Sequence, residues 1–445
     1  MPVKFLAVVF LFVFCHVAVT AQIIVPIAGS GGTVDADGPA TAVSLDYPLG
    51  IAFDDTGSLY ICDSYHHKLR KVKPSFQGYM TTIAGNGVSG DWGDGGPASA
   101  AGLGALYDVA VDKKGNIFLA DAFYNKVRKI DKSGIITTIA GTGIAGYNGD
   151  GIAATSALLN KPFAVKVDDT GNVYIGDRSN YRLRKVDTFG VITTIAGIGV
   201  AGFSGDGGSA TVAQTNGLIS IALDTAFNIY FSDSTRVRKI ATDGTITTVA
   251  GNGILAFTGD GGPATAASIR PSAIFVDKTG VIYIADGLND RIRKVGVDGV
   301  INTIAGTGLS GNSGDWGPPL LATLCVPVGI AVNKDGDIYF SNLCSARVKM
   351  ITNKDLASIR SEATELPTIV VAPNPAQGTI RVTLAGQWLG IVKMTVTNEA
   401  GKVVSQFDGR AGTVTECPKG LRQGVYVITA DDDNGHRAAE KVIVQ

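Results

Sequence analysis

Short runs of strand-forming residues, separated by turn residues, recur along most of the chain. One period contains four such runs: "GIAFD" (50–54), "SLYICD" (58–63), "KLRKV" (68–72) and "MTTIAG" (80–85). Their β-branched and aromatic residues, bounded by glycine and aspartate, are typical of strands. No stretch of the repeats has a helical period. Each period therefore predicts four short antiparallel strands.

These runs return at a nearly constant spacing. The phrase "IAG" or a close variant ends at Gly29, Gly85, Gly141, Gly197, Gly251 and Gly306, in steps of 56, 56, 56, 54 and 55 residues. The second run closes with an acidic or amide residue at Asp63, Asp121, Asp177, Asp233, Asp286 and Asn342. Six copies of a four-stranded unit predict an all-β fold, a six-bladed β-propeller. A loop of about twenty residues leads from each blade to the next.

The two ends of the repeat region complement each other. The fourth-strand phrase comes first, as "IIVPIAG" (23–29), and the last period stops after its third strand, "ARVKMI" (346–351). We expect Ile23–Ile27 to complete blade six and close the ring, which removes an exposed strand edge.

The first residues have the pattern of a secretory signal peptide. Lys4 precedes an apolar run, and Val19-Thr20-Ala21 follows it. We expect cleavage after Ala21, so that residues 1–21 are the signal peptide and 22–352 the propeller. An uncleaved membrane anchor is the alternative, although the run is short for a bilayer span. No later segment suits a span, so we expect a mature chain without a transmembrane segment, secreted or on the outer cell surface.

A second unit follows the repeats. Residues 353–367 form a polar linker, and residues 368–445 contain seven or so short strands. Asn398 to Gly401 and Asp433 to Gly435 are typical of hairpin turns. This tail predicts a small β-sandwich.

Composition narrows the class of protein. The chain has 445 residues, of which 45% are hydrophobic and 17% charged, and its formal net charge is −1. This balance is globular rather than disordered. A nucleic-acid-binding protein usually carries an excess of basic residues, which this composition lacks, so we expect no nucleic-acid partner.

The repeat resembles the NHL family of propellers, in the version with long GDGGPAT loops. The resemblance rests on "PLGIAFDDTGSLYICD" (48–63), "NVYIGDRSNYRLRKV" (172–186) and "GDGGPATAASIRPSAIFVDKTG" (259–280), and covers residue 23 to about residue 352. It implies the fold but no particular activity, because propellers host many functions.

The tail is similar to the C-terminal sorting domain of the type IX secretion system of Bacteroidota. The matching residues are Pro373-Asn374-Pro375, Asn398 to Val403, Leu421 to Tyr426 and Lys441 to Val444. The resemblance implies that the type IX machinery is a partner, that the tail is removed, and that release or surface anchoring follows. A generic adhesion module is the alternative.

Residues repeated in five of the six blades are expected to be structural. Besides the second-strand aspartates, these are third-strand arginines (Arg70, Arg128, Arg184, Arg238, Arg293) and loop aspartates (Asp94, Asp150, Asp206, Asp260, Asp315). Such rows cap turns or pair across strands. A calcium ion in each loop is the alternative.

Departures from the repeat are better candidates for a site. Tyr65, His66 and His67 lie between the second and third strands of blade one, and Trp92 and Trp316 lie in the loops entering blades two and six. We expect these five residues to share one arc of one face, suited to a sugar or a peptide. Alternatively, each tryptophan fills its own loop.

Two residue pairs complete the candidates. Asp108 and Lys166 lie on adjacent first strands near the axis and are expected to form a structural rather than a catalytic ion pair. Cys325 and Cys344 fall at the same end of two antiparallel strands, so a disulfide is plausible in an exported protein. Cys62 is expected in the core of blade one, and Cys417 stands alone in the tail.

These features favour a binding protein over an enzyme. A catalytic zinc site needs about three protein ligands, and the mature propeller has only the adjacent His66 and His67. We therefore predict no metal and no cofactor, with calcium as a possibility, and a glycan, peptide or surface protein as ligand. A metal-dependent lyase or hydrolase and a purely structural envelope protein are the alternatives.

Overall fold

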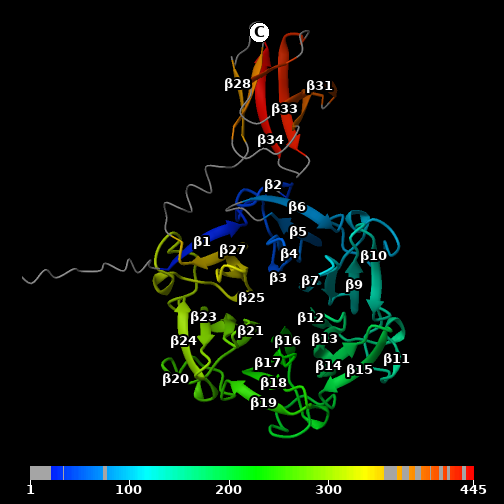
Figure 1. Ribbon diagram of the computed structural model, residues 1–445, viewed down its shortest axis with the longest axis vertical. Coiled ribbons are helices and arrows are strands. Elements are labelled where there is room, and N and C mark those ends of the chain that lie inside the picture. Colours follow the sequence, from blue (N-terminus) through cyan, green and yellow to red (C-terminus); the bar gives the residue numbers. More distant parts are fainter. Residues whose placement is uncertain are drawn as a thin grey trace, which may run out of the picture.

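The strands form a ring of six blades around a central axis, followed by a separate set of strands (Figure 1). The computed structural model describes residues 22–33, 35–73, 78–354, 368–372, 380–385, 392–400, 402–409, 414–417, 421–432 and 437–444. The predicted signal peptide, most of the linker, Pro373-Asn374-Pro375 and the turn at 433–435 lie outside them. Helical structure in the described residues is confined to short 3₁₀ turns, and none of these helices is long and apolar enough to cross a membrane.

Four strands of each blade follow one another from the axis outward. Blade one contains β3 (Pro48–Phe53), β4 (Leu59–Asp63), β5 (Lys68–Val72) and β6 (Tyr79–Ala84). Blade two contains β7 (Leu106–Val111), β8 (Ile117–Asp121), β9 (Lys126–Ile130) and β10 (Ile136–Ala140). Blade three contains β12 (Pro162–Val167), β13 (Val173–Asp177), β14 (Arg182–Val186) and β15 (Val191–Ala196).

The other half of the ring repeats this order. Blade four contains β16 (Leu218–Leu223), β17 (Ile229–Asp233), β18 (Arg236–Ile240) and β19 (Ile246–Ala250). Blade five contains β21 (Pro271–Val276), β22 (Ile282–Asp286), β23 (Arg291–Val295) and β24 (Val300–Ala305). Blade six contains β25 (Pro327–Val332), β26 (Ile338–Asn342), β27 (Arg347–Thr352) and β1 (Ile23–Ala28).

The N-terminal strand closes the ring, as the sequence predicts. β1 pairs antiparallel with β27, with Ile24 opposite Ile351, and the two lie side by side in Figure 1. Ile24 is fully buried and packs with Phe340 of the same blade. The first and last strands of the propeller therefore share one sheet, and no blade is left with three strands.

The long loops contain more structure than the expected plain connection. In three blades a two-residue strand covers the outer edge of the fourth strand: β2 (Gly38–Pro39), β11 (Ile152–Ala153) and β20 (Gly262–Pro263). Single bridges from Pro97 and Ser209 do the same in blades two and four. Five of the six loops contain a 3₁₀ turn, at η1 (Ala98–Ala100), η2 (Ala154–Ser156), η4 (Ala210–Val212), η5 (Ala264–Ala266) and η7 (Pro319–Leu321). The loops thus protect the edges of the blades.

Apolar clusters between blades hold the ring together. One cluster joins Leu69 of blade one to Val109 of blade two, and the next joins Ala110 of blade two to Val165 of blade three. Each first strand therefore contributes side chains to both of its neighbours, so that the core is a continuous band around the axis.

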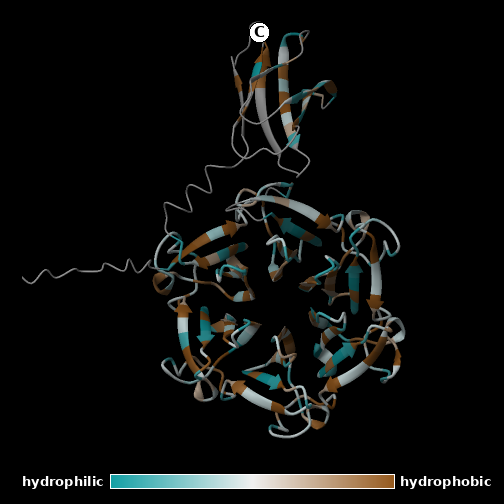
Figure 2. Ribbon diagram, viewed as in Figure 1, coloured by the Kyte–Doolittle hydropathy of each residue, from teal (hydrophilic) through white to brown (hydrophobic). Residues whose placement is uncertain are grey.

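A buried ion-pair network holds each blade internally. The third strands are the hydrophilic segments in the middle of the blades (Figure 2). In blade three, fully buried Arg184 donates to Asp150 of the preceding loop at 2.9 Å and to Asp177 at 3.5 Å. Asp177 also accepts the Asn160 backbone N–H at 2.7 Å, which fixes the chain just before the first strand. This Asp–Arg–Asp unit links three elements of one blade.

Equivalent units recur around the ring. Arg128 pairs with Asp94, Arg238 with Asp206 and Asp233, and Arg293 with Asp260 and Asp286. In blade one, Arg70 pairs with Asp35 and Asp63, and in blade six Lys349 pairs with Asp315. The repeated aspartates and arginines are therefore engaged with one another.

The described residues of the tail form a two-sheet sandwich of seven strands. One sheet has the order β28 (Thr368–Ala372), β29 (Arg381–Ala385), β32 (Val414–Glu416), and the other β31 (Val403–Gly409), β30 (Val392–Asn398), β33 (Gly424–Asp432), β34 (Arg437–Val444). Val382 of the first sheet and Ile428 of the second belong to one buried cluster. At the predicted turn after β30, the Asn398 carboxamide oxygen accepts the backbone N–H groups of Ala400 and Lys402.

Candidate ligand-binding site

One end of the ring carries the segments that depart from the repeat. First strands begin there and second strands end there, since Pro48 lies opposite Asp63, Leu106 opposite Asp121 and Pro162 opposite Asp177. We call this end the loop face, because the long loops reach the first strands on it.

Five side chains form a cluster on the loop face over blades one to three. We call it the aromatic cluster; its members are Tyr47, Tyr65, Tyr107, Phe163 and Arg178. Tyr47 stacks on Tyr65, with ring centroids 4.3 Å apart, and Tyr107 stacks on Phe163 at 3.7 Å. The Arg178 guanidinium carbon lies 4.6 Å from the Phe163 centroid. Two stacked ring pairs and one cation therefore lie within a small part of this face.

The two ring pairs are close enough to affect each other electrostatically. Burial raises the pKa of the Tyr107 hydroxyl, Tyr65 and Tyr47 act in the same direction, and Arg178 acts against them. The outer pair is open to solvent, since Tyr47 is 40% and Tyr65 55% exposed. Tyr107 and Phe163 are half-buried. The cluster thus combines one exposed ring pair with one partly buried ring pair.

A backbone irregularity positions the inner pair. The strand register shifts between Leu106 and Asp108, and again between Pro162 and Ala164. Tyr107 and Phe163 are the extra residues of these bulges, which release their side chains from the regular alternation of the strand. The other blades carry smaller or non-aromatic residues here, namely Leu49, Ile219, Ser272 and Val328.

The structure divides the arc expected from the sequence. Of its five residues, only Tyr65 belongs to the aromatic cluster. The Trp92 ring lies against Gly90 and Gly102 and fills the space that a Cβ on either would occupy, so it fills its own loop. The Trp316 backbone N–H donates to the Ile24 carbonyl at 2.7 Å, which places this residue on the outer closing strand rather than at the loop-face mouth.

Both histidines contact the blade framework. His66 Nδ1 lies 3.0 Å from Asp63, the position that Asn180 takes beside Asp177 in blade three. The hydrogen bond with Asp63 is the main cause of a raised His66 pKa. His67 Nδ1 lies 3.1 Å from the Gly104 carbonyl oxygen and so ties blade one to blade two.

Only one group of described residues has the make-up of a metal site. Asp35, Asp63 and His66 bring their ligand atoms within 4.8 Å of one another. Arg70 is ion-paired with both of these carboxylates, and Lys68 Nζ lies 2.6 Å from Asp35. Because two cations already neutralise the group, and the other blades repeat it without histidine, its geometry fits a framework role better than a metal centre.

The predicted ion pair between Asp108 and Lys166 is present near the axis. Lys166 Nζ lies 3.7 Å from Asp108, and the Asp108 carboxylate also accepts the Val165 backbone N–H at 3.1 Å. Burial raises the Asp108 pKa. In blade four Ser220 accepts the Ile274 backbone N–H at 3.0 Å, so a polar side chain bridging two first strands is a feature of the ring.

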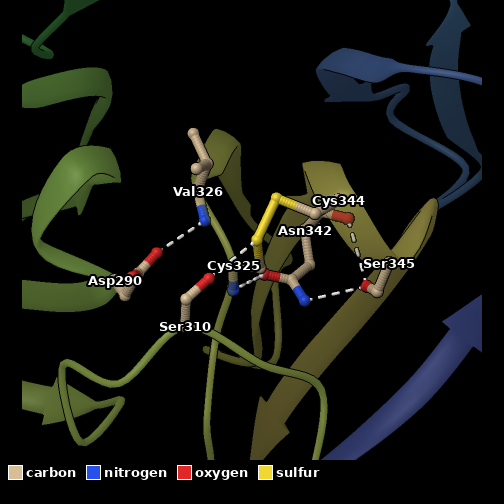
Figure 3. The surroundings of a disulfide bond; sticks show 7 residues. All are labelled: Asp290, Ser310, Cys325, Val326, Asn342, Cys344 and Ser345. Carbon is tan, nitrogen blue, oxygen red and sulfur yellow. Dashed lines mark hydrogen bonds between the residues drawn. A yellow bond between two sulfur atoms is a disulfide. The ribbon is translucent and has the colours of Figure 1, made fainter.

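Cys325 and Cys344 form a disulfide in blade six (Figure 3). Their Cα atoms are 5.5 Å apart, and the Cys325 backbone N–H donates to Asn342, the residue that takes the place of the second-strand aspartate. The bond joins the segment before β25 to the turn after β26. Cys62 and Cys417 are free and buried.

The blades, their Asp–Arg–Asp units and the closing strand define the class, a six-bladed NHL-type β-propeller. Residues 45–72 match the family model "NHL repeat", 253–310 match "Teneurin NHL domain" and 370–445 match "Secretion system C-terminal sorting domain". The chain therefore contains segments that match NHL-type propeller repeats and a C-terminal segment that matches the sorting domain.

Individual proteins share part of the sequence or the fold of this chain. Teneurin-4 of Mus musculus is 27% identical over 361 residues, which is 71% of this chain but only 12% of teneurin-4. Two solved structures from Bacteroides thetaiotaomicron share the fold. A protein of unknown function has a TM-score of 0.55 at 20% identity, covering 75% of this chain and 76% of its own. An auxiliary nutrient binding protein has a TM-score of 0.55 at 14% identity, covering 74% and 76%.

Proposed function

We propose that this protein is an exported binding module whose propeller holds its ligand at the aromatic cluster. The observation that carries the proposal is the pair of ring stacks beside Arg178 on the loop face. Exposed aromatic faces with a few polar groups are typical of recognition sites. The scaffold does not require them, because the other blades fold with Ile219 or Ser272 in the same place.

The surroundings support binding rather than catalysis. The candidate titratable groups of blades one to three are engaged in the framework: His66 with Asp63, and Asp108 with Lys166. The fold shared with an auxiliary nutrient binding protein also supports a binding role.

Export is the second part of the proposal. The sorting domain supports delivery to the outer cell surface, after cleavage behind Ala21. Deleting residues 368–445 is expected to retain the propeller inside the outer membrane, which cell fractionation with an antibody against the propeller measures. Surface delivery without the tail would contradict this part.

The binding site is tested with two variants of residues 22–445. Tyr65→Ala/Tyr107→Ala removes one ring from each stack, and Phe189→Ala removes an exposed ring from the opposite face of blade three, where Phe189 is 91% exposed. An immobilised panel of neutral and acidic oligosaccharides and of short peptides serves as the probe. We expect the double variant to lose about tenfold in capture, given that buried aromatic contacts dominate such sites.

The control decides the interpretation. Phe189→Ala is expected to capture like the unchanged chain, and thermal unfolding checks that the double variant is folded. Equal capture by all three proteins, with every one folded, would contradict the proposed site.

A further inference from the structure

We propose that the ligand of the aromatic cluster is an acidic carbohydrate, with a sugar carboxylate bound to Arg178. This inference rests on the proposed function and adds the class of ligand to it. It starts from the one formal charge in the cluster.

Arg178 and Arg270 are the two described arginines of the ring without an ion pair or a side-chain hydrogen bond, and Arg178 is the one that contacts a ring of the aromatic cluster. The third-strand arginines pair with aspartates, and Arg182, Arg236 and Arg291 donate to loop carbonyls. Among the described residues, Arg178 contacts the Phe163 ring but forms no ion pair, and its buried Nε has no hydrogen-bond partner. Its place in the repeat is uncharged in every other blade, where it holds Ser64, Ala122, Ser234, Gly287 and Leu343. Blade three therefore offers a cation that the framework does not use.

The chemistry of a guanidinium selects the charge of the ligand. Its planar donors match a carboxylate with two parallel hydrogen bonds, and its stacking on an aromatic ring pre-orients that fork. Arg178 would approach such a carboxylate beside the Phe163 ring, so that one group binds the charge while the rings bind the rest of the ligand.

The shape of the cluster favours a sugar over a peptide. The stacked pairs are nearly parallel, with interplanar angles of 15° and 20°. The ring faces that this stacking leaves uncovered suit the apolar faces of pyranose rings, and the tyrosine hydroxyls suit sugar hydroxyls. A peptide added as a strand would need a free sheet edge, and the outer edges of the blades are covered by the loops.

The test uses matched ligands. Oligomers of galacturonic, glucuronic and mannuronic acid are titrated against residues 22–445 by calorimetry, each beside its carboxyl-reduced, neutral form. The variants are Arg178→Gln and, as a control of equal charge change, Lys132→Gln in the exposed turn at the opposite end of blade two. We expect at least one acidic oligomer to bind, its neutral form to bind at least about tenfold more weakly, and Arg178→Gln to erase that difference.

Each other outcome has a defined meaning. Equal binding of acidic and neutral forms, unchanged by Arg178→Gln, overturns the acidic ligand and leaves the site. Failure of every uronic-acid oligomer, with an aspartate- and glutamate-rich peptide bound in a Tyr65-dependent way, overturns the carbohydrate. If no probe responds to Tyr65→Ala/Tyr107→Ala, the proposed function itself fails.

Discussion

At the scale of single residues, the buried arginine of the third strand determines how a blade is built. Arg184 has no solvent exposure, yet it reaches one aspartate in the loop before its blade and one at the end of the second strand. A buried charge is tolerated only when it is paired and hydrogen-bonded. The long polar loop can therefore dock against each blade in one register.

Removing one member of this unit should be costly. Arg184→Met leaves the Asp177 carboxylate buried without its cation, so the free energy of unfolding is expected to fall by about 3–5 kcal/mol near neutral pH. Urea unfolding followed by circular dichroism measures it. Lys113→Met is the matched control, since Lys113 and its partner Asp169 are both exposed on the surface, and a much smaller change is expected there because solvent screens exposed ion pairs. Equal effects of the two substitutions would contradict this account.

The same aspartates make stability depend on pH. Burial raises the pKa of Asp121, Asp177 and Asp233 to about 6. An aspartate in an unfolded chain has a pKa of about 3.9. Between this pKa and the raised pKa of the folded state, the folded protein binds more protons than the unfolded chain. The stabilisation is complete below the unfolded pKa and is lost as pH rises through the folded one. The raised pKa of His66 acts with the same sign.

We therefore expect a larger free energy of unfolding at about pH 5 than at about pH 7.5. Asp168, Asp224 and Asp277, whose pKa values are lowered, contribute only at more acidic pH. Denaturation at the two pH values measures the difference in the free energy of unfolding. The substitution Asp177→Asn should make this difference smaller. Stability that rises with pH over this interval would show that these carboxylates are not desolvated as described.

At the scale of elements, the long loops are attached to the blades in two alternative ways. In blades three to five an aromatic loop residue lies under two arginines; Tyr147, for example, has Arg182 at 3.9 Å and Arg184 at 4.9 Å. In blade two the same loop position is Asp91, and it pairs with Lys126 at 2.7 Å. A cation–π contact and an ion pair thus take the same place in the repeat.

This equivalence predicts a compensating pair of substitutions. Asp91→Tyr alone is expected to destabilise the protein by about 1 kcal/mol, because Lys126 loses its partner. Adding Lys126→Arg recreates the arrangement of blade three and should recover most of the loss. A double-mutant cycle on thermal unfolding gives the coupling energy, expected to exceed about 0.5 kcal/mol. Additive effects would mean that the two attachments are not interchangeable.

Elements were largely predictable from sequence, but the site was not. The strands, the number of blades and the closing strand can be predicted because the four-strand sequence pattern recurs six times and each repeat supports the same assignment. Tyr65 was found because it interrupts a repeated phrase. Tyr107 and Phe163 were missed because an aromatic residue inside a strand is usually core, and a pattern of alternation cannot show the bulge that releases it. Trp92 packs against Gly90 and Gly102 of its own loop and Trp316 bonds to β1, contacts that the repeat pattern does not encode.

At the scale of the whole molecule, closure of the ring depends on the six residues of β1, Ile23–Ala28. Ile24 packs in the core of blade six, and its backbone N–H and carbonyl bond to the loop at Gly317 and Trp316. Without β1, the edge of β27 would be open to pairing with another chain.

Ile24→Asp tests this closure. It places a charge in a fully buried position, so we expect a loss of about 3 kcal/mol or more and a tendency to self-associate. Thermal unfolding and light scattering measure the two effects. Thr137→Asp, at an exposed position of the equivalent strand of blade two, should be nearly neutral. An Ile24→Asp protein that stays monomeric and as stable as the Thr137→Asp protein would contradict closure by β1.

The most direct test of the central claim, that the loop face over blades one to three binds the ligand, is hydrogen–deuterium exchange. Residues 22–445 are compared with and without the probe captured best from the panel. The account predicts slowed exchange around Tyr47, Tyr65, Tyr107 and in the segment from Phe163 to Arg178, with no change at the turn that carries Phe189. Protection confined to the opposite face or to the outer loops, with these segments unchanged, would contradict it.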